Sequence, residues 1–309
     1  MFTLFQKTVG DEITCRNVGL HTGRKITMTI KPAEADRGIV FVRRDVISHN
    51  LITAKLENVC DTRLATTIGI NGTRVATVEH LLSALRGMGI DNALIEVDGP
   101  EVPIMDGSAL PFVHMLKQAG TRPQRKERRI IKIKKAVTVS EGEGKASLLP
   151  ADSFQITYRI HFDHPLIAEQ VYHAEFSNGA YEREICPART FGFLRDVEYL
   201  QAKGLALGGS LRNAVVLTED RIVNKEGLRF PDEFVKHKVL DAIGDLSLLG
   251  MPIVGHFVAY KSGHRLNILL LRELLRHQDC WEIVTPTEKD HCPPAREGKS
   301  SFESAISYM

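Results

Sequence analysis

The sequence predicts an α+β fold with two domains of similar topology. Its 309 residues exceed an average domain of about 150 residues, and runs with a strand pattern are interrupted by only a few helical ones. A short pattern also occurs twice, in residues 79–82 and 236–240, where a His lies near the start of a helical run that ends in glycine and leads into an apolar strand. Two similar halves would explain this repeat, and so would a chance match.

Apolar residues that alternate with polar ones, or that are β-branched, predict the strands. Ile26, Met28 and Ile30 alternate with threonines, and residues 154–160 alternate in the same way. The other predicted strands are 39–42, 93–97, 130–139, 171–176 and 253–260. Apolar residues at helical spacing predict helices at 78–88, 110–118, 197–203, 232–249 and 266–276.

A basic segment separates the two predicted domains. Residues 121–135 contain eight basic residues, one acid and one proline, but no aromatic residue on which a base could stack. This composition favours a linker over a nucleic-acid-binding patch. We therefore expect an N-terminal α+β domain at 1–122, a linker at 123–129 and a C-terminal α+β domain at 130–285. Residues 286–309 contain two adjacent prolines and several serines and are expected to form a loose tail.

Composition and motifs exclude several classes of protein. Forty Lys and Arg against 38 Asp and Glu give a net charge of +2, which is no sign of a nucleic-acid binder. The chain contains no G-x-S-x-G, H-E-x-x-H or dinucleotide-binding glycine motif. It starts without a signal-peptide pattern, its longest apolar run is too short to span a bilayer, and its five cysteines are widely spaced. We expect a cytoplasmic monomer with free thiols, no transmembrane segment and no nucleic-acid partner.

The segment 232–249 contains the strongest chemical signal. His237 and Asp241 are four residues apart on a predicted helix and share one face, and Asp245 lies one turn further along. An imidazole and a carboxylate at this spacing suit Zn²⁺, which takes nitrogen and oxygen ligands at about 2.0–2.2 Å. The alternative is a surface His–Asp pair that supports the helix.

Residues 77–80 offer a third ligand and a base. Thr77 is expected to cap a helix, with Glu79 and His80 in its first turn. Adjacent helical residues point about 100° apart, so His80 could bind a metal while Glu79 contacts the water on it. The alternative is a capped helix with an acid at its positive end.

Two further segments contain candidate groups. A glycine-bearing turn places His264 at the end of a strand, an exposed position suited to chemistry, although a simple helix entry with Ser262 near the cap would have the same sequence. In residues 186–193, Thr190 could donate a hydrogen bond, and Phe191 and Phe193 could form an apolar wall. Aromatic residues are more often part of a core, so this segment alone is uninformative.

Six segments together carry a resemblance to a known family: 18–23, 77–80, 103–109, 188–193, 237–246 and 261–264. With these motifs, in this order, the chain resembles the UDP-3-O-acyl-N-acetylglucosamine deacetylases, the zinc enzymes of bacterial lipid A synthesis. The resemblance extends to about residue 285. It implies two similar domains, each a sheet with helices packed between the two sheets, and each with an insert that shapes the active site.

The same resemblance implies a set of site residues. By the family pattern His80, His237 and Asp241 bind Zn²⁺. Glu79 is then the general base and His264 the general acid. Thr190 holds the developing oxyanion together with the metal, and Asp245 orients His264.

The family also binds a nucleotide diphosphate and a fatty acyl chain. The residues at positions that the family uses for the nucleotide are Lys145, Phe162, Lys238 and Lys261. An insert at 193–215 is implied to form the acyl passage, and the predicted substrate contacts in and beside it are Phe191, Phe193 and Leu211. Leu211 stands where some relatives have an aromatic residue, and His161 where some have an acid, so acyl-chain preference and nucleotide contacts do not follow from the resemblance.

The expected activity is therefore removal of the N-acetyl group from UDP-3-O-(3-hydroxyacyl)-N-acetylglucosamine, with release of acetate, as the committed step of lipid A synthesis. One alternative is a zinc amidohydrolase that acts on a different acetylated sugar. An alternative from another class is a structural zinc or nucleic-acid-binding protein that uses the basic segment. That alternative leaves Glu79, Thr190 and His264 without a role.

Overall fold

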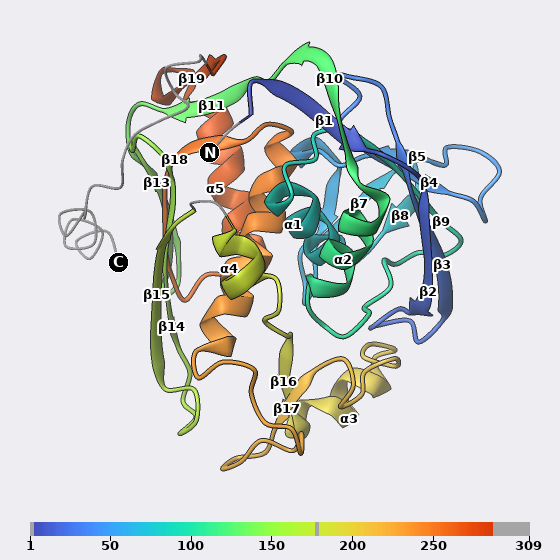
Figure 1. Ribbon diagram of the computed structural model, residues 1–309. Helices are drawn as coiled ribbons and strands as arrows, with labels where there is room; N and C mark the ends of the chain where they lie inside the picture. Colours follow the sequence, from blue (N-terminus) through green and yellow to red (C-terminus); the bar gives the residue numbers. More distant parts are fainter. Residues whose placement is uncertain (1–2, 177–178, 287–309) are drawn as a thin grey trace.

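The computed structural model describes residues 3–176 and 179–286 and confirms the predicted α+β fold with two similar domains. Two large sheets form the outer layers, and helices α1, α2, α4 and α5 pack between them (Figure 1). Each half also has a small sheet of its own outside these layers. The predicted tail lies outside the described residues from 287 onward.

The N-terminal half contains a five-stranded sheet in the order β2-β3-β9-β4-β5. Its strands are β2 (Ile13–Val18), β3 (Lys25–Pro32), β9 (Ala93–Val97), β4 (Ile39–Arg43) and β5 (Leu51–Thr53). The helices are α1 (Glu79–Gly87) and α2 (Leu110–Ala119), and a 3-10 turn lies at Leu56–Asn58. The small sheet consists of β6 (Val59–Asp61), β7 (Thr67–Ile70) and β8 (Thr73–Val75).

The C-terminal half contains a seven-stranded sheet around β18, which pairs with β13, β14 and β11. Its strands are β11 (Ile130–Ile133), β12 (Val137–Glu141), β13 (Gly144–Leu149), β14 (Phe154–His161), β15 (Glu169–Glu175), β18 (Ile253–Tyr260) and β19 (Trp281–Val284). The buried helices are α4 (Glu233–Leu246) and α5 (His264–Arg276). Short turns of other helical types lie at Tyr181–Ile185, Ser247–Leu249 and Gln278–Cys280.

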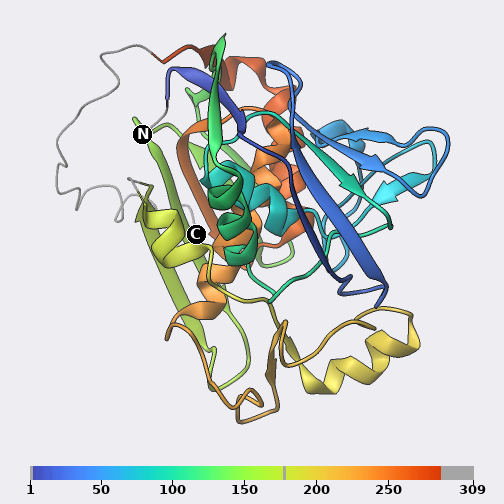
Figure 2. The same ribbon diagram turned by 45° about the vertical axis from the view of Figure 1, so that its right-hand side comes forward.

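The insert of the C-terminal half lies below the helices and is coloured yellow (Figure 2). It contains the parallel pair of β16 (Phe191–Phe193) and β17 (Val215–Leu217), and α3 (Leu194–Ala202). None of the residues of α3 is buried, so this helix packs only lightly on the rest of the chain. The sequence pattern placed its start at 197, three residues late.

Most of the segment predicted as a linker lies in a strand. β10 (Thr121–Glu127) pairs with β1 (Phe5–Val9) in an antiparallel ribbon along the top of the molecule (Figure 1). Its sequence has no apolar alternation because it is exposed along almost its whole length. Arg128, which follows, is buried against Asp91. The domain boundary at 123–129 stays a prediction.

The predicted strand 130–139 is two strands in the structure. The chain leaves the sheet after Ile133, where the backbone N–H groups of Lys134 and Lys135 both donate to the carbonyl of Cys280. It re-enters as β12 at Val137. The periodicity of the side chains continues across this break, so the sequence pattern did not reveal it.

The described cysteines, Cys15, Cys60, Cys186 and Cys280, are free thiols. Over residues 3–176 and 179–286, no helix combines the length and the apolar character that a bilayer span requires. Cys292 lies outside the described residues.

Helices α1 and α4 pack against each other with an unusually close backbone approach. A Cβ atom on Gly244 would lie 2.1 Å from the backbone oxygen of Glu79, so only glycine fits at this crossing. Gly244 is in the last turn of α4, and Glu79 begins α1. The contact therefore sets how closely the first turn of α1 approaches the functional face of α4.

We expect Gly244→Ala to destabilise the protein by about 1–3 kcal/mol, because the new methyl group forces the two helices apart. Helix propensity alone would act in the opposite direction, by up to about 1 kcal/mol in favour of Ala. Urea unfolding of the two proteins measures the difference. Gly192→Ala is the matched control, since a Cβ there meets no atom within 4 Å. A Gly244→Ala variant at least as stable as the parent would contradict this interpretation.

Candidate metal centre and active site

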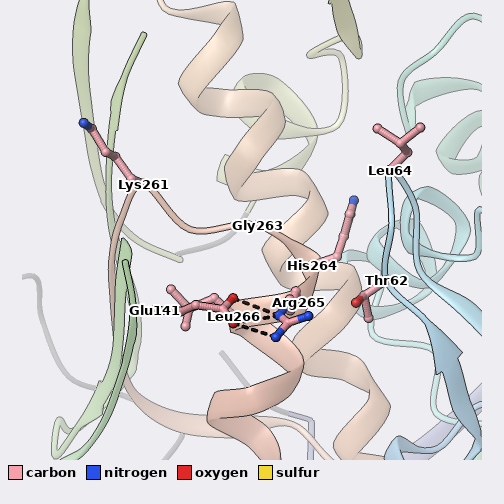
Figure 3. Close-up of a pocket in the computed structure, with 8 residues that line it drawn as sticks. All are labelled: Thr62, Leu64, Glu141, Lys261, Gly263, His264, Arg265 and Leu266. Carbon is pink, nitrogen blue, oxygen red and sulfur yellow. Dashed lines mark hydrogen bonds and ion pairs between the residues drawn. The ribbon is translucent and has the colours of Figure 1, made fainter. Parts of the chain in front are cut away.

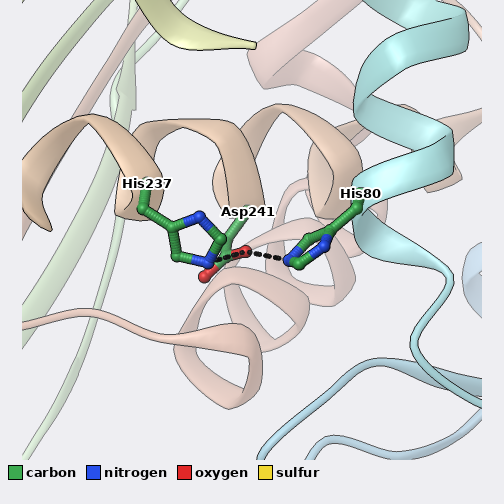
Figure 4. A group of neighbouring side chains, drawn as sticks. All are labelled: His80, His237 and Asp241. Carbon is green, nitrogen blue, oxygen red and sulfur yellow. Dashed lines mark ion pairs between the residues drawn. The ribbon is translucent and has the colours of Figure 1, made fainter. Parts of the chain in front are cut away.

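Three predicted metal ligands meet between the two halves of the chain (Figure 4). His80 comes from the first turn of α1, and His237 and Asp241 come from adjacent turns of α4. The Oδ1 atom of Asp241 lies 3.5 Å from Nε2 of His80 and 3.4 Å from Nε2 of His237. One ligand atom from each residue lies within 4.8 Å of the others, so the group could hold a metal ion.

Hydrogen bonds orient His237 and Asp241 for this role. Nδ1 of His237 lies 3.1 Å from the carbonyl oxygen of Ala188, so Nδ1 is the protonated nitrogen and Nε2 keeps its lone pair for the centre. Burial lowers the pKa of His237 to about 3, which keeps the ring neutral. Lys238 donates to Oδ2 of Asp241 at 2.8 Å. Burial alone would raise the pKa of Asp241, but the ammonium group of Lys238 holds it well below its ordinary value.

A second observation indicates that these three ligand atoms fit a divalent metal ion. Oδ1 of Asp241 is buried and has no hydrogen-bond partner among the described residues, although an unpaired buried carboxylate oxygen is costly. It faces the two Nε2 atoms at distances too long for good hydrogen bonds. A cation between the three atoms would satisfy all of them. Two imidazoles and one carboxylate form a ligand set typical of catalytic zinc, which keeps a position open for water or substrate.

Glu79 lies beside the centre, at the first position of α1. Its Oε2 atom accepts a hydrogen bond from the backbone N–H of Thr66 at 3.0 Å, and its Oε1 atom lies 3.8 Å from Nε2 of His264. Burial raises the pKa of Glu79, and the neighbouring His264 and His80 oppose this rise. The carboxylate is thus a buried base aimed at the space between the metal ligands and His264.

The predicted cap of α1 by Thr77 is wrong. The residue at the cap position is Val78, which makes no side-chain cap bond. Thr77 has a positive φ of 58°, and its hydroxyl donates to the buried Oε1 atom of Glu101 at 3.0 Å. The sequence could not distinguish a Thr77 that caps the helix from one that bonds to Glu101, because Glu101 is 24 residues away.

His264 begins α5, and its side chain is buried rather than exposed as the sequence predicted. The cap residue is Gly263, not Ser262. The Nδ1 atom of His264 lies 2.9 Å from Oδ2 of Asp245. Burial alone would lower the pKa of His264, but Asp245 and Glu79 raise it to about 9. The ring is therefore an imidazolium at neutral pH, with Nδ1 donating to Asp245 and Nε2 directed toward Glu79.

Two residues of this network escaped the sequence analysis. The Thr66 hydroxyl donates to Oδ1 of Asp245 at 2.6 Å, and the Asn267 amide donates to Oδ2 at 2.9 Å. Thr66 thereby contacts Glu79 through its backbone and Asp245 through its side chain. Asn267 lies one turn after His264 on α5, and that spacing was a usable signal. Thr66 had none, because it lies in a loop 179 residues from Asp245.

The predicted aromatic contacts form one cluster next to His237. Phe191 packs edge-on against Phe234 and Phe162, with ring centroids 5.0 and 5.6 Å apart, and lies 6.4 Å from the His237 ring. Phe193 lies 6.1 Å from Phe162. Thr190, just before Phe191, is held by main-chain hydrogen bonds to Gly107 and Val215. Leu211 is 43% exposed.

The predicted basic residues lie in three different settings. Lys238 is bound to Asp241, a predicted metal ligand. Lys261 pairs with Glu143 at 2.6 Å, and its ammonium group lies 5.5 Å from the centre of the Tyr260 ring. Lys145 is the strand partner of Tyr260 in the β13–β18 pair. Lys145 and Lys261 therefore lie at the same end of the large sheet.

A cavity of about 280 Å³ opens at this end of the sheet (Figure 3). Lys261 and Glu141 come from the C-terminal sheet, and Thr62 and Leu64 from the loop between β6 and β7. His264 lines the cavity between them. The candidate acid is thus open to a molecule bound between the small sheet of one half and the large sheet of the other.

The chain matches one protein family over most of its length. The family model of UDP-3-O-acyl N-acetylglycosamine deacetylase matches residues 6–276. A UDP-3-O-acyl-N-acetylglucosamine deacetylase of Syntrophus aciditrophicus is 64% identical over 281 residues, which cover 91% of this chain and 89% of the relative. A protein of the same name from Myxococcus xanthus is 52% identical, over 92% of this chain and 91% of the relative. The chain belongs to the UDP-3-O-acyl-N-acetylglucosamine deacetylase family.

Proposed function

We propose that this protein is a Zn²⁺-dependent hydrolase that removes the N-acetyl group from UDP-3-O-(3-hydroxyacyl)-N-acetylglucosamine and releases acetate. The names of its relatives support the substrate class. The observation that carries the chemistry is the meeting of a three-ligand group with a buried Glu–His pair at one point between the halves. By the family resemblance, the reaction belongs to lipid A synthesis in the cytoplasm.

The metal would be held by His80, His237 and Asp241. Zn²⁺ bound there supplies Lewis acidity, which polarises the acetyl carbonyl and makes water a better nucleophile near neutral pH. The neutral His237 ring and the ionised Asp241 are already in the protonation states that ligands require.

The remaining steps belong to side chains of this chain. Glu79 takes a proton from the attacking water, because its carboxylate faces the centre and burial raises its pKa. His264 donates a proton to the departing amine, since Asp245 and Glu79 keep it charged. The hydroxyl group of Thr190 donates a hydrogen bond to the developing oxyanion. Asp245 positions His264 and stabilises its charged form.

Substrate contacts follow from the same arrangement. We assign the nucleotide diphosphate to the cavity at Lys261 and, by the family resemblance, to Lys145, Lys238 and Phe162. The acyl chain is assigned to the insert, along Phe191, Phe193 and Leu211. Acetate release from the acylated nucleotide sugar, compared with UDP-N-acetylglucosamine, tests the assignment, and equal turnover of both would favour a different acetylated sugar.

The protein as purified should bind one equivalent of Zn²⁺, and His237→Ala should lose it. The reason is that two of the three ligands come from α4, so removing one leaves only a bidentate site. Metal analysis after gel filtration measures the stoichiometry. His256→Ala is the control, because this buried His lies on β18 and bonds to Thr157 instead. A full equivalent of zinc in His237→Ala would exclude this ligand set.

Glu79→Gln should retain the metal but lose turnover by on the order of a hundredfold or more, the usual effect of removing a general base. The amide keeps the shape of the side chain and can still accept the hydrogen bond from Thr66. The measurement is kcat together with metal content. If the variant lost its metal, Glu79 would be a ligand and the proposed base would be wrong.

Activity should follow a bell-shaped pH profile. Turnover needs Glu79 ionised, so it rises with pH on the acid side, and it needs His264 protonated, so it falls as the pH passes about 9. Asp245→Asn removes the main group that raises the pKa of His264, so the basic limb should move to lower pH. His264→Gln should cut turnover and flatten that limb. A basic limb that is unchanged in both variants belongs to another group.

A further inference from the structure

Glu233 is a buried carboxylate that the proposed mechanism leaves without a role. It is the first residue of α4, and its side chain is fully buried. It accepts hydrogen bonds from two backbone N–H groups, those of Arg189 at 3.0 Å and Arg229 at 2.6 Å. The guanidinium of Arg189 also donates to it, through Nε at 2.8 Å and Nη2 at 3.2 Å. One carboxylate thus binds the loop at 188–190 by both its backbone and a side chain.

This loop holds two groups that matter for the site. The carbonyl of Ala188, directly before Arg189, accepts the hydrogen bond from Nδ1 of His237. Thr190, directly after it, is the proposed oxyanion donor. Glu233 and His237 are four residues apart on α4. The side chain of Glu233 therefore binds the loop, and the loop in turn orients the ring of His237.

We propose that Glu233 is a positioning residue that fixes the 188–190 loop, so that Ala188 holds the His237 ring in its metal-binding tautomer and orientation. This inference rests on the proposed metal site. Hydrogen-bond partners of metal-bound His side chains typically contribute 10–100-fold to metal affinity or activity. A buried ion pair on its own contributes little net stability, so stabilising the fold is a poor account of this arrangement.

Glu226 provides a matched control. It also bonds to Arg189, through Nη1 at 3.1 Å, but its side chain is 58% exposed, and its other side-chain partner is the Asn224 amide at 3.4 Å rather than a backbone N–H of the 188–190 loop. Glu226→Gln therefore removes a carboxylate charge that pairs with Arg189, but it leaves the hydrogen bonds to the backbone of the loop in place. Glu233→Gln replaces one of the two carboxylate oxygens by an NH2 group, so at most one of the two backbone N–H groups keeps its acceptor.

The experiment measures Zn²⁺ affinity by competition with a chelator, together with urea unfolding of the metal-free proteins. Glu233→Gln should weaken Zn²⁺ binding by about 10–100-fold. Glu226→Gln should leave it within about threefold of the parent. Equal affinity in the parent and in Glu233→Gln would overturn the proposal, whatever the change in unfolding.

Glu233→Asp covers the case in which Glu233→Gln does not fold. It keeps the buried charge beside Arg189, but its shorter side chain cannot reach both backbone N–H groups. Zn²⁺ binding should weaken in this variant as well, and parent-like affinity in it would overturn the proposal. If the parent protein itself bound no Zn²⁺, the proposed function would fail. If the parent and both Glu233 variants bound it equally tightly, only the role of Glu233 would fail.

Discussion

The close packing of α1 on α4 is the contact on which the rest of the site depends. Gly244 lets the backbone of Glu79 come against α4, so the first turn of one helix lies beside the functional turns of the other. His80 then completes the ligand group with His237 and Asp241, and Glu79 faces His264. Neither half contains all of these groups. The proposed metal centre therefore lies at the interface between the halves, and the two outer sheets enclose the helices that form it (Figure 1).

The geometry of α4 explains how one helix serves several partners. Glu233, His237, Asp241 and Asp245 follow one another at intervals of four residues. Because each residue turns the helix by about 100°, a step of four advances the side chain by one turn and rotates it by about 40°. Over the whole series the direction changes by about 120°. Glu233 accordingly reaches the 188–190 loop, the middle pair faces His80, and Asp245 reaches α5.

Much of this arrangement could be predicted from the sequence, and the limits have physical causes. The long helices and the strands β3, β4, β9, β14, β15 and β18 follow from local periodicity, and the pair at 237 and 241 follows from helical spacing. Residues 77–80 offered His80 as a third ligand and Glu79 as a base, but only the family resemblance favoured these roles over a surface His–Asp pair and a capped helix, and it alone gave the role of His264. Contacts that join distant segments were missed: Thr66 to Asp245, and Thr77 to Glu101. The strand character of β10 was missed as well, since an exposed, charged strand has no apolar alternation.

The central claim is that one metal ion is bound between the halves by two imidazoles and one carboxylate. X-ray absorption at the zinc edge of the loaded protein tests this claim most directly. The account predicts only nitrogen and oxygen neighbours at about 2.0–2.2 Å, with the scattering pattern of two imidazoles in the parent and of one in His80→Ala. A sulfur neighbour at about 2.3 Å, or a spectrum that His80→Ala leaves unchanged, would show that the metal lies elsewhere.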